Sequence, residues 1–338
     1  MKAIVNILNR NEVTTIPVRN AKYIEEFSNV TIENRIINKK NFFSFRRNYE
    51  IFKEAKIIHT HHTFSSLIAS IFYLVFILSK KKRYFVHTVH RNFESFSGFM
   101  KFVYIFLIFP FRDYIIANSY TTKLSLEKHM TASAFLNIEV ITNGVDLNYF
   151  TDISRESIEF DTINMVNVGR MVKIKNQSLL IHTLKELRDR NYDATLDFCG
   201  QGEEYNSLLE LVVDNKLENY VKFHGMIPEH EVYKILKRSN FSIIPSFNEG
   251  FGVATIESMA SGTITLGSNI AINNEIIQDK ELLFSPFDHK QLTKLIIKFY
   301  SNKNLYTTKV DYLINRVQKY TAKNTAKNHF SFYKKLIG

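Results

Sequence analysis

Short runs of β-branched and aromatic residues alternate with helical patterns along most of the 338-residue chain, in two successive series. The runs of the first series predict strands at Ala3–Leu8, Ala55–His59, Tyr84–His90, Tyr114–Asn118 and Ile138–Thr142. Those of the second predict strands at Ile163–Val168, Thr195–Cys199, Val221–His224, Phe241–Pro245 and Thr263–Leu266. Helices are predicted between most of them, at 64–79, 97–110, 120–130, 176–190, 203–214, 229–238 and 252–261. Strands that alternate with helices indicate βαβ units and parallel sheets.

The interval between the two series marks a domain boundary. The polar segment 147–160 lacks hydrophobic periodicity and is expected to be a linker. We therefore predict an α/β protein with two doubly wound domains, residues 1–150 and 151–310, followed by a final segment, 311–338. Ligands of such folds bind at the carboxyl ends of the strands, so a cleft between the domains is the expected site.

The amino-acid composition limits the class of protein and the cellular compartment in which it is expected. Hydrophobic residues make up 45% and charged residues 23% of the chain, which excludes disordered, collagen-like and disulfide-stapled proteins. The lone cysteine, Cys199, has no intrachain partner and is expected to lie in the core, so a reducing cytosol is the simpler compartment. The N-terminus lacks the apolar core of a signal peptide and predicts a strand instead.

The net charge of +11 is unevenly distributed. Residues 1–150 carry +9, residues 151–300 carry −5, and residues 301–338 carry +7. Such asymmetry favours a negatively charged partner, either a membrane, an anionic substrate or a nucleic acid. A simply solvated surface explains the same charge equally well.

Two apolar stretches need separate interpretation. Leu67–Leu78 is uninterrupted and is followed by the basic run 80–83, and Phe102–Phe111 contains Pro110. Both are shorter than the ~20 residues that span a bilayer. They predict buried helices or, as the alternative, helices that contact a membrane surface, which the basic run would favour.

The segment 245–262 is the most informative part of the chain. It follows the apolar strand that ends at Ile244, and it contains Glu249, Gly250, Gly252 and, eight residues after the first glutamate, Glu257. The glycines allow a ligand to approach the backbone closely. A helix that begins near Gly252 directs its free N–H groups toward an anion such as a phosphate, and Glu257 could bind the hydroxyls of a ribose.

A second basic element follows the first strand of the second series. Arg170 offers a rigid fork of donors to phosphate oxygens, and Lys175 adds a mobile positive charge. Two cations at the carboxyl end of one strand would neutralise a diphosphate leaving group. The alternative is a surface loop with Asn176 as a capping residue.

Taken together, these motifs resemble the retaining glycosyltransferases of family 4, which have the GT-B fold. The resemblance covers 160–300 specifically and the first half more loosely. It is carried by Gly169-Arg170, Lys175-Asn176, Gly200-Gln201-Gly202, Phe223-His224-Gly225, Pro245-Ser246, Glu249-Gly250-Phe251-Gly252 and Glu257 to Gly262. In the first half, Ile141 to Asp146, His59 to His62 and Thr88-Val89-His90 are similar to the family's pattern.

The resemblance implies a role for each matching residue. Glu257 matches the glutamate that binds the nucleotide ribose, and Glu249 the one beside the donor sugar. Arg170 and Lys175 match the pair that binds the diphosphate. His90 matches a histidine near the donor sugar. The backbone that contacts sugar and phosphate corresponds to Gly250, Phe251, Gly252 and Val253.

The family needs no metal in catalysis, and the sequence has no Asp-x-Asp, which argues against the metal-dependent alternative fold. His59, His61 and His62 have no carboxylate or cysteine partner at ligand spacing, so zinc is not expected. The sequence departs from the family after the first strand, where residues 9–15 contain no glycine. The resemblance also implies that the last helix crosses back to the first domain.

The resulting prediction is a hexosyltransferase that moves a hexose or N-acetylhexosamine from a nucleoside diphosphate sugar, most commonly a UDP-sugar in this family. The expected acceptor is a lipid-linked, lipopolysaccharide (O-antigen) or capsule-type glycan, with no further cofactor. The enzyme would be cytoplasmic and peripheral at the inner membrane surface. A sugar-nucleotide epimerase or hydrolase and a non-catalytic scaffold that partners another transferase are the alternatives. A nucleic-acid partner would explain the charge but none of the motifs.

Overall fold

The computed structural model describes residues 2–8, 31–36, 49–50, 52–53, 55–77, 82–129, 137–151 and 161–337. The chain divides into two compact units. Unit 1 comprises Met1–Gly144 together with Tyr320–Gly338, and unit 2 comprises Val145–Lys319. The structure thus divides the chain after 144 and 319, where the sequence suggested 150 and 310. The helix α13 (Lys303–Val317) belongs to unit 2, and α14 (Ala322–Ile337) belongs to unit 1.

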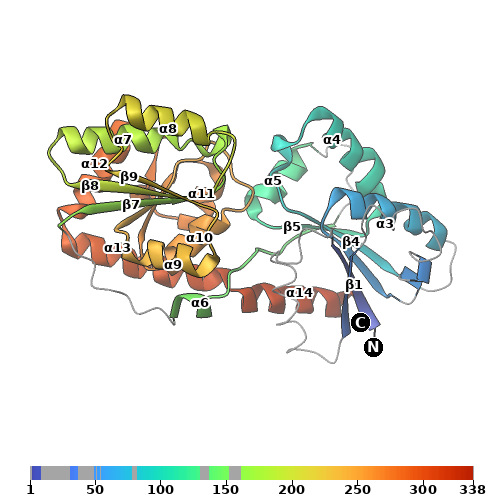
Figure 1. Cartoon of the computed structure of the whole chain (residues 1–338). Coiled ribbons are helices and arrows are strands. Elements are labelled where there is room, and N and C mark those ends of the chain that lie inside the picture. The colour runs from blue at the N-terminus through green and yellow to red at the C-terminus, as the bar shows by residue number, and fades with distance from the viewer. Residues whose placement is uncertain are drawn as a thin grey trace. The chain divides into compact units, whose positions relative to one another are not determined.

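Unit 1 is built on a parallel six-stranded sheet with the order β2-β1-β3-β4-β5-β6 (Figure 1). In that order the strands are Thr31–Ile36, Lys2–Leu8, Ile57–Thr60, Tyr84–Val89, Tyr114–Ala117 and Asn137–Val140. The helical elements of the unit, besides α14, are α3 (Thr63–Phe76), η2 (Phe93–Ser95), α4 (Gly98–Phe102), η3 (Val103–Ile108), η4 (Phe109–Phe111) and α5 (Tyr120–His129).

Neighbouring residues of the central strands supply two different cores. Ile57, Val86 and Ile116 pack with Phe332 and the rest of the apolar face of α14. Their neighbours on the same strands face the other side of the sheet, where Ile58 and Phe85 pack with α3, and Ile115 packs with η3. Side chains alternate across a strand, so an uninterrupted apolar run buries both faces. β3 is buried at every position, although only Ile57 and Ile58 are apolar and His59 and Thr60 are polar.

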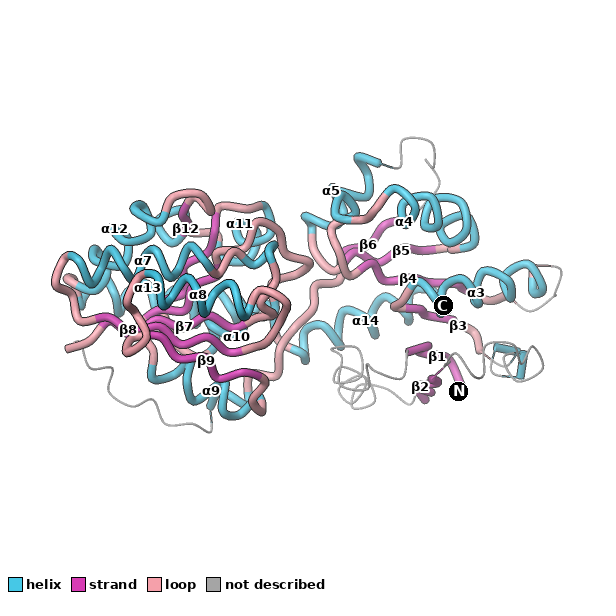
Figure 2. Tube along the Cα trace, turned by 45° about the horizontal axis from the view of Figure 1, so that its top comes forward, coloured by secondary structure: helices cyan, strands magenta, loops and turns pink. Residues whose placement is uncertain are grey.

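Unit 2 repeats the architecture, with the sheet order β12-β11-β10-β7-β8-β9. The strands are, in that order, Leu283–Phe284, Ile264–Ser268, Phe241–Ile244, Ile163–Val168, Ala194–Cys199 and Val221–Gly225. The α-helices of the unit are α6 (Asn148–Thr151), α7 (Ser178–Asp189), α8 (Tyr205–Asp214), α9 (Glu229–Arg238), α10 (Val253–Ala260), α11 (Ala271–Ile277), α12 (His289–Tyr300) and α13. Its short 3₁₀ helices are η5 (Lys173–Lys175) and η6 (Lys280–Leu282). A further one, η7 (Gln318–Tyr320), spans the point in the sequence where unit 2 ends and unit 1 resumes. Figure 2 shows the strands of each unit in the middle, with helices on both sides.

The predicted strands are confirmed with ends that differ by one or two residues. Two strands were not predicted, and both lie at sheet edges: β2, whose sequence is largely polar, and β12, which has two residues. The helix predicted over 97–110 is wrong in part. It is α-helical only to Phe102, continues as a π-helix, and ends as a 3₁₀ turn that contains Pro110, which has no N–H to donate. The expected linker contains α6, and its residues 152–160 lie outside the described part.

Gly144 lies where the chain leaves the sheet of unit 1 and meets the start of α14. A Cβ atom at this position would lie 2.3 Å from the backbone oxygen of Thr321 and 2.7 Å from the nitrogen of Ala322. The close approach of two backbones therefore requires glycine here.

We expect Gly144→Ala to lower the free energy of unfolding by about 1–3 kcal/mol, because two backbone segments must separate to admit the methyl group. Gly98→Ala is the matched control, since nothing lies within 4 Å of a Cβ atom there and position 98 is helical. Urea denaturation of the two variants checks this. Equal midpoints would contradict the packing described for Gly144.

Candidate active site

The two motifs predicted in unit 2 follow neighbouring strands. β10 pairs with β7 in parallel, with Phe241 opposite Met165. The loop after β7 carries Arg170 and ends at Lys175, and the loop after β10 carries Glu249. Parallel strands direct their carboxyl ends to the same edge of a sheet, so the two loops meet there.

Lys175 and Glu249 form an ion pair between these loops. Lys175 Nζ lies 2.5 Å from Glu249 Oε1, and the two side chains are 21% and 10% exposed. The hydroxyl of Ser246 donates a second hydrogen bond, 2.6 Å long, to the same carboxylate oxygen. The Glu249 carboxylate is thus held at a fixed place, and the positive charge of Lys175 is fixed beside it.

Asn176 ties the loops together from the other side. Its backbone is left-handed, with a φ of 54°, which asparagine tolerates better than most residues. Its side-chain amide donates hydrogen bonds to the carbonyls of Pro245 (3.1 Å) and Pro286 (2.8 Å). The residue considered as a simple cap at the sequence level therefore connects the loops that follow β7, β10 and β12.

Gly252 is the N-cap of α10 and has a φ of 77°. A Cβ atom would lie 3.0 Å from Ile276 Cδ1 and 3.2 Å from Thr255 Oγ1, so both conformation and space favour glycine. No side chain caps this helix, and its first turn contains no acidic residue. The first N–H groups of α10 are therefore free of side-chain caps and could donate hydrogen bonds to an anion at the same edge of the sheet.

Glu257 lies within α10 and is half-buried. The hydroxyl of Tyr233, on α9, donates a 3.4 Å hydrogen bond to its Oε1. Phe251 is buried, and Gly250 and Val253 are half-buried. Arg170 is exposed, and its carbonyl accepts a 2.9 Å hydrogen bond from the side chain of Gln177, which shapes the loop.

Glycine also lets the loop after β8 approach the one after β7. Gly200 has a φ of 140°, and a Cβ atom there would lie 2.0 Å from the carbonyl oxygen of Gly169. A Cβ atom at Gly202 would lie 2.1 Å from the carbonyl oxygen of Met171. Cys199, just before this turn, is a buried core residue as expected, and burial raises the pKa of its thiol to about 12.

Sequence reasoning missed two supporting residues of unit 2. Ser246 was part of the motif, but no role was assigned to it, although a hydroxyl three residues before a glutamate in a turn could have suggested a contact. Tyr233 carried no signal, because only the tertiary structure brings α9 to Glu257.

In unit 1, the half-buried His90 lies against a cluster of buried histidines. His61 Nδ1 lies 3.1 Å from His90 Nε2. The ring of His59 lies 4.3 Å from that of His61, and its two nitrogens are hydrogen-bonded to Tyr333 (2.5 Å) and Thr88 (2.7 Å). His61 is buried against the rings of His59 and His90. The glycine-free loop 9–15 lies outside the described residues.

Burial keeps these histidines neutral. It lowers the pKa of His90 to about 3, with His62 and His329 adding repulsion, and that of His329 to about 4. The pKa values of His59 and His61 are also well below 6.5, first because of burial and then because of the other histidines. A neutral His90 acts as a hydrogen-bonding group and not as a cation. Within the described ranges, no three His, Cys, Asp or Glu side chains are arranged to hold a metal ion.

These shifts predict that acid destabilises unit 1. Unfolded histidines titrate near 6.5, whereas folded His329 and His90 titrate near 4 and 3. Between pH 4 and pH 6.5 the unfolded chain binds more protons than the folded chain. The stabilisation that comes from keeping these histidines neutral is therefore complete above pH 6.5 and is lost as the pH falls toward 4. Within this range, each such histidine lowers the free energy of unfolding by about 1.4 kcal/mol for every unit by which the pH falls.

We therefore expect His329→Gln to flatten the pH dependence of the unfolding temperature between about pH 7 and pH 5, because one titrating group is removed. His230→Gln, at an exposed position of unit 2, is the control. Thermal unfolding followed by circular dichroism measures the effect. A wild-type unfolding temperature that does not change over this range would show that the cluster is not neutral.

Comparison with known proteins agrees with this geometry. Residues 151–319 match the family model described as Glycosyl transferases group 1, and residues 13–149 match that of Glycosyltransferase Family 4. The O-antigen chain mannosyltransferase RfbU of Salmonella typhimurium is 29% identical over 177 residues, which cover 52% of this chain and 48% of that protein. An N-acetylgalactosaminyltransferase of Campylobacter jejuni that acts on a diphospho-undecaprenol-linked sugar is 29% identical over 167 residues, 49% of this chain and 44% of its own. The chain spans about half the length of the curated relatives it matches.

Two solved structures cover nearly the whole chain. Alr3699/HepE of Anabaena, solved in complex with UDP and glucose, superposes with a TM-score of 0.81 at 15% identity and covers 99% of this chain and 100% of its own. Sucrose-phosphate synthase of Thermosynechococcus elongatus has a TM-score of 0.78 at 18% identity, and the match covers 100% of this chain and 99% of that one. These likenesses establish the fold as GT-B. Since the group 1 model matches half of the chain and the family 4 model most of the remainder, the chain belongs to the group 1 glycosyltransferases.

Proposed function

We propose that the protein is a retaining hexosyltransferase that moves a hexose or N-acetylhexosamine from a nucleoside diphosphate sugar to a glycan acceptor. The observation that carries this proposal is the convergence of Lys175, Glu249 and the uncapped start of α10 at one sheet edge of unit 2. This edge offers a fixed cation, backbone N–H groups and a fixed carboxylate, which suit a diphosphate joined to a sugar.

UDP is the nucleotide we propose for the donor. Alr3699/HepE was solved with UDP and with UDP-glucose, and a pneumococcal O-GlcNAc transferase with a similar fold was solved with UDP and GlcNAc. We assign the ribose to Glu257, whose carboxylate can accept hydrogen bonds from two hydroxyl groups.

The leaving group determines the proposed mechanism. As the bond between the sugar C1 and the diphosphate oxygen breaks, negative charge grows on the diphosphate. Arg170, Lys175 and the N–H groups of α10 would stabilise that charge. The ammonium of Lys175 has three donors, so its bond to Glu249 leaves two for phosphate oxygens.

Retention requires the acceptor oxygen to bond to C1 on the face that the diphosphate leaves. The acceptor proton then passes to a diphosphate oxygen, which balances the step without a protein base. Glu249 would orient the donor sugar and stabilise positive charge at C1. For His90 the proposal keeps the role that the family resemblance implies, near the donor sugar, where a neutral ring acts as a hydrogen-bonding group. No metal or other cofactor enters this proposal.

The donor site can be tested with two exposed cations of one loop. Arg170→Ala should lower kcat/KM by about 10²-fold, as the loss of one donor to a developing anion does in other enzymes. Lys173→Ala, three residues further on and also exposed, should change it little. Release of nucleoside diphosphate from a panel of nucleotide sugars, with and without a membrane extract of the host, measures both.

Glu257→Ala should abolish UDP binding measured by calorimetry. Release that needs no extract would favour a hydrolase or epimerase, and UDP binding without release from any donor would favour a non-catalytic scaffold. Equal loss of kcat/KM in the Arg170 and Lys173 variants would contradict the assignment of Arg170.

We further propose that the acceptor is carried by a lipid and that unit 1 binds the cytoplasmic surface of a membrane. α3 and η3 pack against each other, and Thr63 is hydrogen-bonded to Tyr104 between them (3.0 Å). Large apolar side chains of these neighbouring elements are exposed by 41–74%; they are Ile71, Leu74, Val75 and Ile77 on or just after α3, and Phe99, Phe102, Phe106 and Leu107 on α4 and η3. Exposed apolar groups in this number are typical of an interaction surface.

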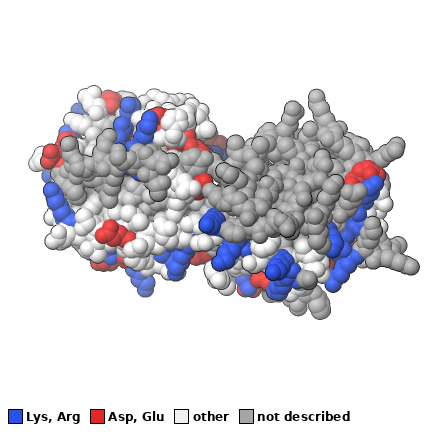
Figure 3. Space-filling view, turned by 90° about the horizontal axis from the view of Figure 1, so that it is seen from below, with Lys and Arg blue, Asp and Glu red and all other residues white. Residues whose placement is uncertain are grey.

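Charge favours a lipid surface as the partner. Residues 55–112 contain eight Lys and Arg and one acidic residue, Glu94. Seen from below, Figure 3 shows Lys and Arg side chains at its right as well, on the side of unit 1 that carries α14 and not on the side of α3. Apolar side chains among cations bind membranes that contain anionic lipid. Among the described helices, none is long and apolar enough to cross a bilayer.

Binding to vesicles tests this proposal. The double variant Phe99→Ser/Phe106→Ser should reduce co-sedimentation with vesicles that contain phosphatidylglycerol by at least about tenfold, because two rings no longer enter the lipid. Leu209→Ser/Val213→Ser, at exposed positions of α8 in unit 2, is the control. Equal binding by both variants would show that another surface is used.

A further inference from the structure

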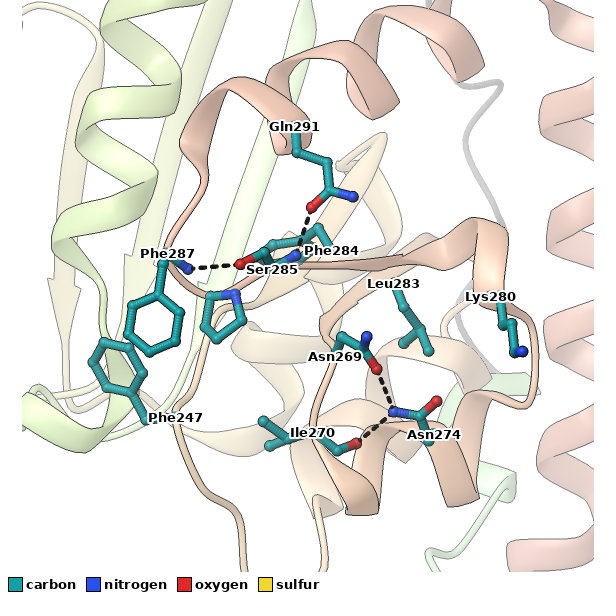
Figure 4. Close-up of a pocket in the computed structure, with 11 residues that line it drawn as sticks. Phe247, Asn269, Ile270, Asn274, Lys280, Leu283, Phe284, Ser285, Phe287 and Gln291 are labelled. Carbon is teal, nitrogen blue, oxygen red and sulfur yellow. Dashed lines mark hydrogen bonds between the residues drawn. The ribbon is translucent and has the colours of Figure 1, made fainter.

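A pocket of unit 2 lies beside the proposed donor site without containing Glu249 or Lys175. Its volume is about 650 Å³, and its walls come from the loops after β10, β11 and β12 and from α12 (Figure 4). We infer that this pocket binds a pyranose ring of a glycan, as a subsite separate from the one for the donor nucleotide. The inference rests on the proposed function, because it assumes that the substrate is a glycan.

Two aromatic rings form one side of the pocket. The rings of Phe247 and Phe287 lie 5.2 Å apart with an angle of 32° between their planes. They are 41% and 81% exposed, so most of the Phe287 ring is available to a ligand. A pyranose presents a face of C–H groups that can pack on such a ring. This packing would remove the apolar surface of the ring from water, which is favourable.

Amide side chains lie across from the rings, as Figure 4 shows. The nitrogen of Asn274 donates hydrogen bonds to Asn269 Oδ1 (2.7 Å) and to the carbonyl of Ile270 (2.9 Å). These bonds fix both amides and leave Asn274 Oδ1 and Asn269 Nδ2 without a partner among the described residues. Gln291 likewise uses its oxygen to accept from the N–H of Ser285 (2.7 Å) and keeps its nitrogen for a ligand.

This combination distinguishes a sugar from other ligands. A sugar ring has an apolar face and a rim of hydroxyl groups that both donate and accept, which matches rings on one side and oriented amides on the other. A lipid chain would leave the amides unsatisfied. Lys280 at the rim adds a cation that would suit a sugar bearing a carboxylate or a phosphate.

The pocket is joined to the proposed reaction centre. Phe247 lies between Ser246 and Glu249 in the chain, and its N–H donates to the carbonyl of Ile174 (2.9 Å). Asn176, next to Lys175, holds the carbonyl of Pro286, which precedes Phe287. A sugar bound here would therefore contact the loops that position Lys175 and Glu249, as expected for a further residue of the glycan that is being extended.

Saturation-transfer NMR on the full chain tests the inference. The probes are the methyl α-pyranosides of glucose, mannose and N-acetylglucosamine, each with and without saturating UDP. At least one should bind with a dissociation constant in the millimolar range. Phe287→Ala should weaken that binding by about fivefold or more, while Phe287→Tyr, which keeps the ring, restores it. Val213→Ala, an exposed apolar position on α8, should leave it unchanged.

The outcomes separate this inference from the proposed function. Absence of binding by all three pyranosides, or equal binding by Phe287→Ala, would overturn the subsite even if UDP binds. Loss of pyranoside binding on addition of UDP would make the pocket part of the nucleotide site and would also overturn it. Pyranoside binding that depends on Phe287 in a protein that releases no nucleoside diphosphate would support the subsite and contradict the transferase.

Discussion

The parallel pairing of β10 with β7 is the constraint on which the proposed chemistry depends. It places the loop with Arg170 and Lys175 beside the loop with Glu249, although 74 residues separate the two partners of the ion pair. Neither loop could hold its charged group alone, because each is short and partly exposed. The ion pair, the Ser246 hydroxyl and the two hydrogen bonds of Asn176 convert the two loops into one structure.

Glycine has a specific role at this edge of the sheet. Gly200 and Gly202 allow the backbone after β8 to lie against the backbone after β7, and Gly252 turns the chain into α10. A side chain at these positions would separate the loops or block the start of the helix. The same physical reason applies to Gly144 in unit 1, where the start of α14 meets the chain that leaves the sheet.

A strand or helix could be predicted from the sequence where its own residues form a recognisable hydrophobic run or motif. A central strand such as β5 is a continuous apolar run and is largely buried, and the E-x7-E segment marks its own strand, turn and helix. Edge strands carry less signal, so the polar β2 and the two-residue β12 were missed. The change from α-helix to π-helix at Val103 leaves no mark in the residue pattern.

Contacts between distant residues were beyond prediction for the same reason. The residue type of Lys175 indicated a phosphate, and the family resemblance implied a sugar beside Glu249, but nothing in the sequence indicated that the two residues pair with each other. Tyr233 beside Glu257 and Tyr333 beside His59 arise only when helices pack on their sheets. Spacing and resemblance selected the candidate groups, and the tertiary structure determines which of them share a bond.

Burial determines the charge of the histidine cluster in unit 1. Burial lowers the pKa of His90 to about 3, and its neighbours His59 and His61 are neutral for the same reason. These three histidines can therefore donate or accept hydrogen bonds, but they carry no positive charge at neutral pH. A departing diphosphate needs positive charge, and the described residues that can supply it at the proposed site are Arg170, Lys175 and the start of α10. Because Lys175 is already bound to Glu249, a phosphate that binds Lys175 also acts on the carboxylate proposed to face the sugar. In the proposed mechanism, the binding of the leaving group and the orientation of the donor sugar would thus be coupled through one ammonium group.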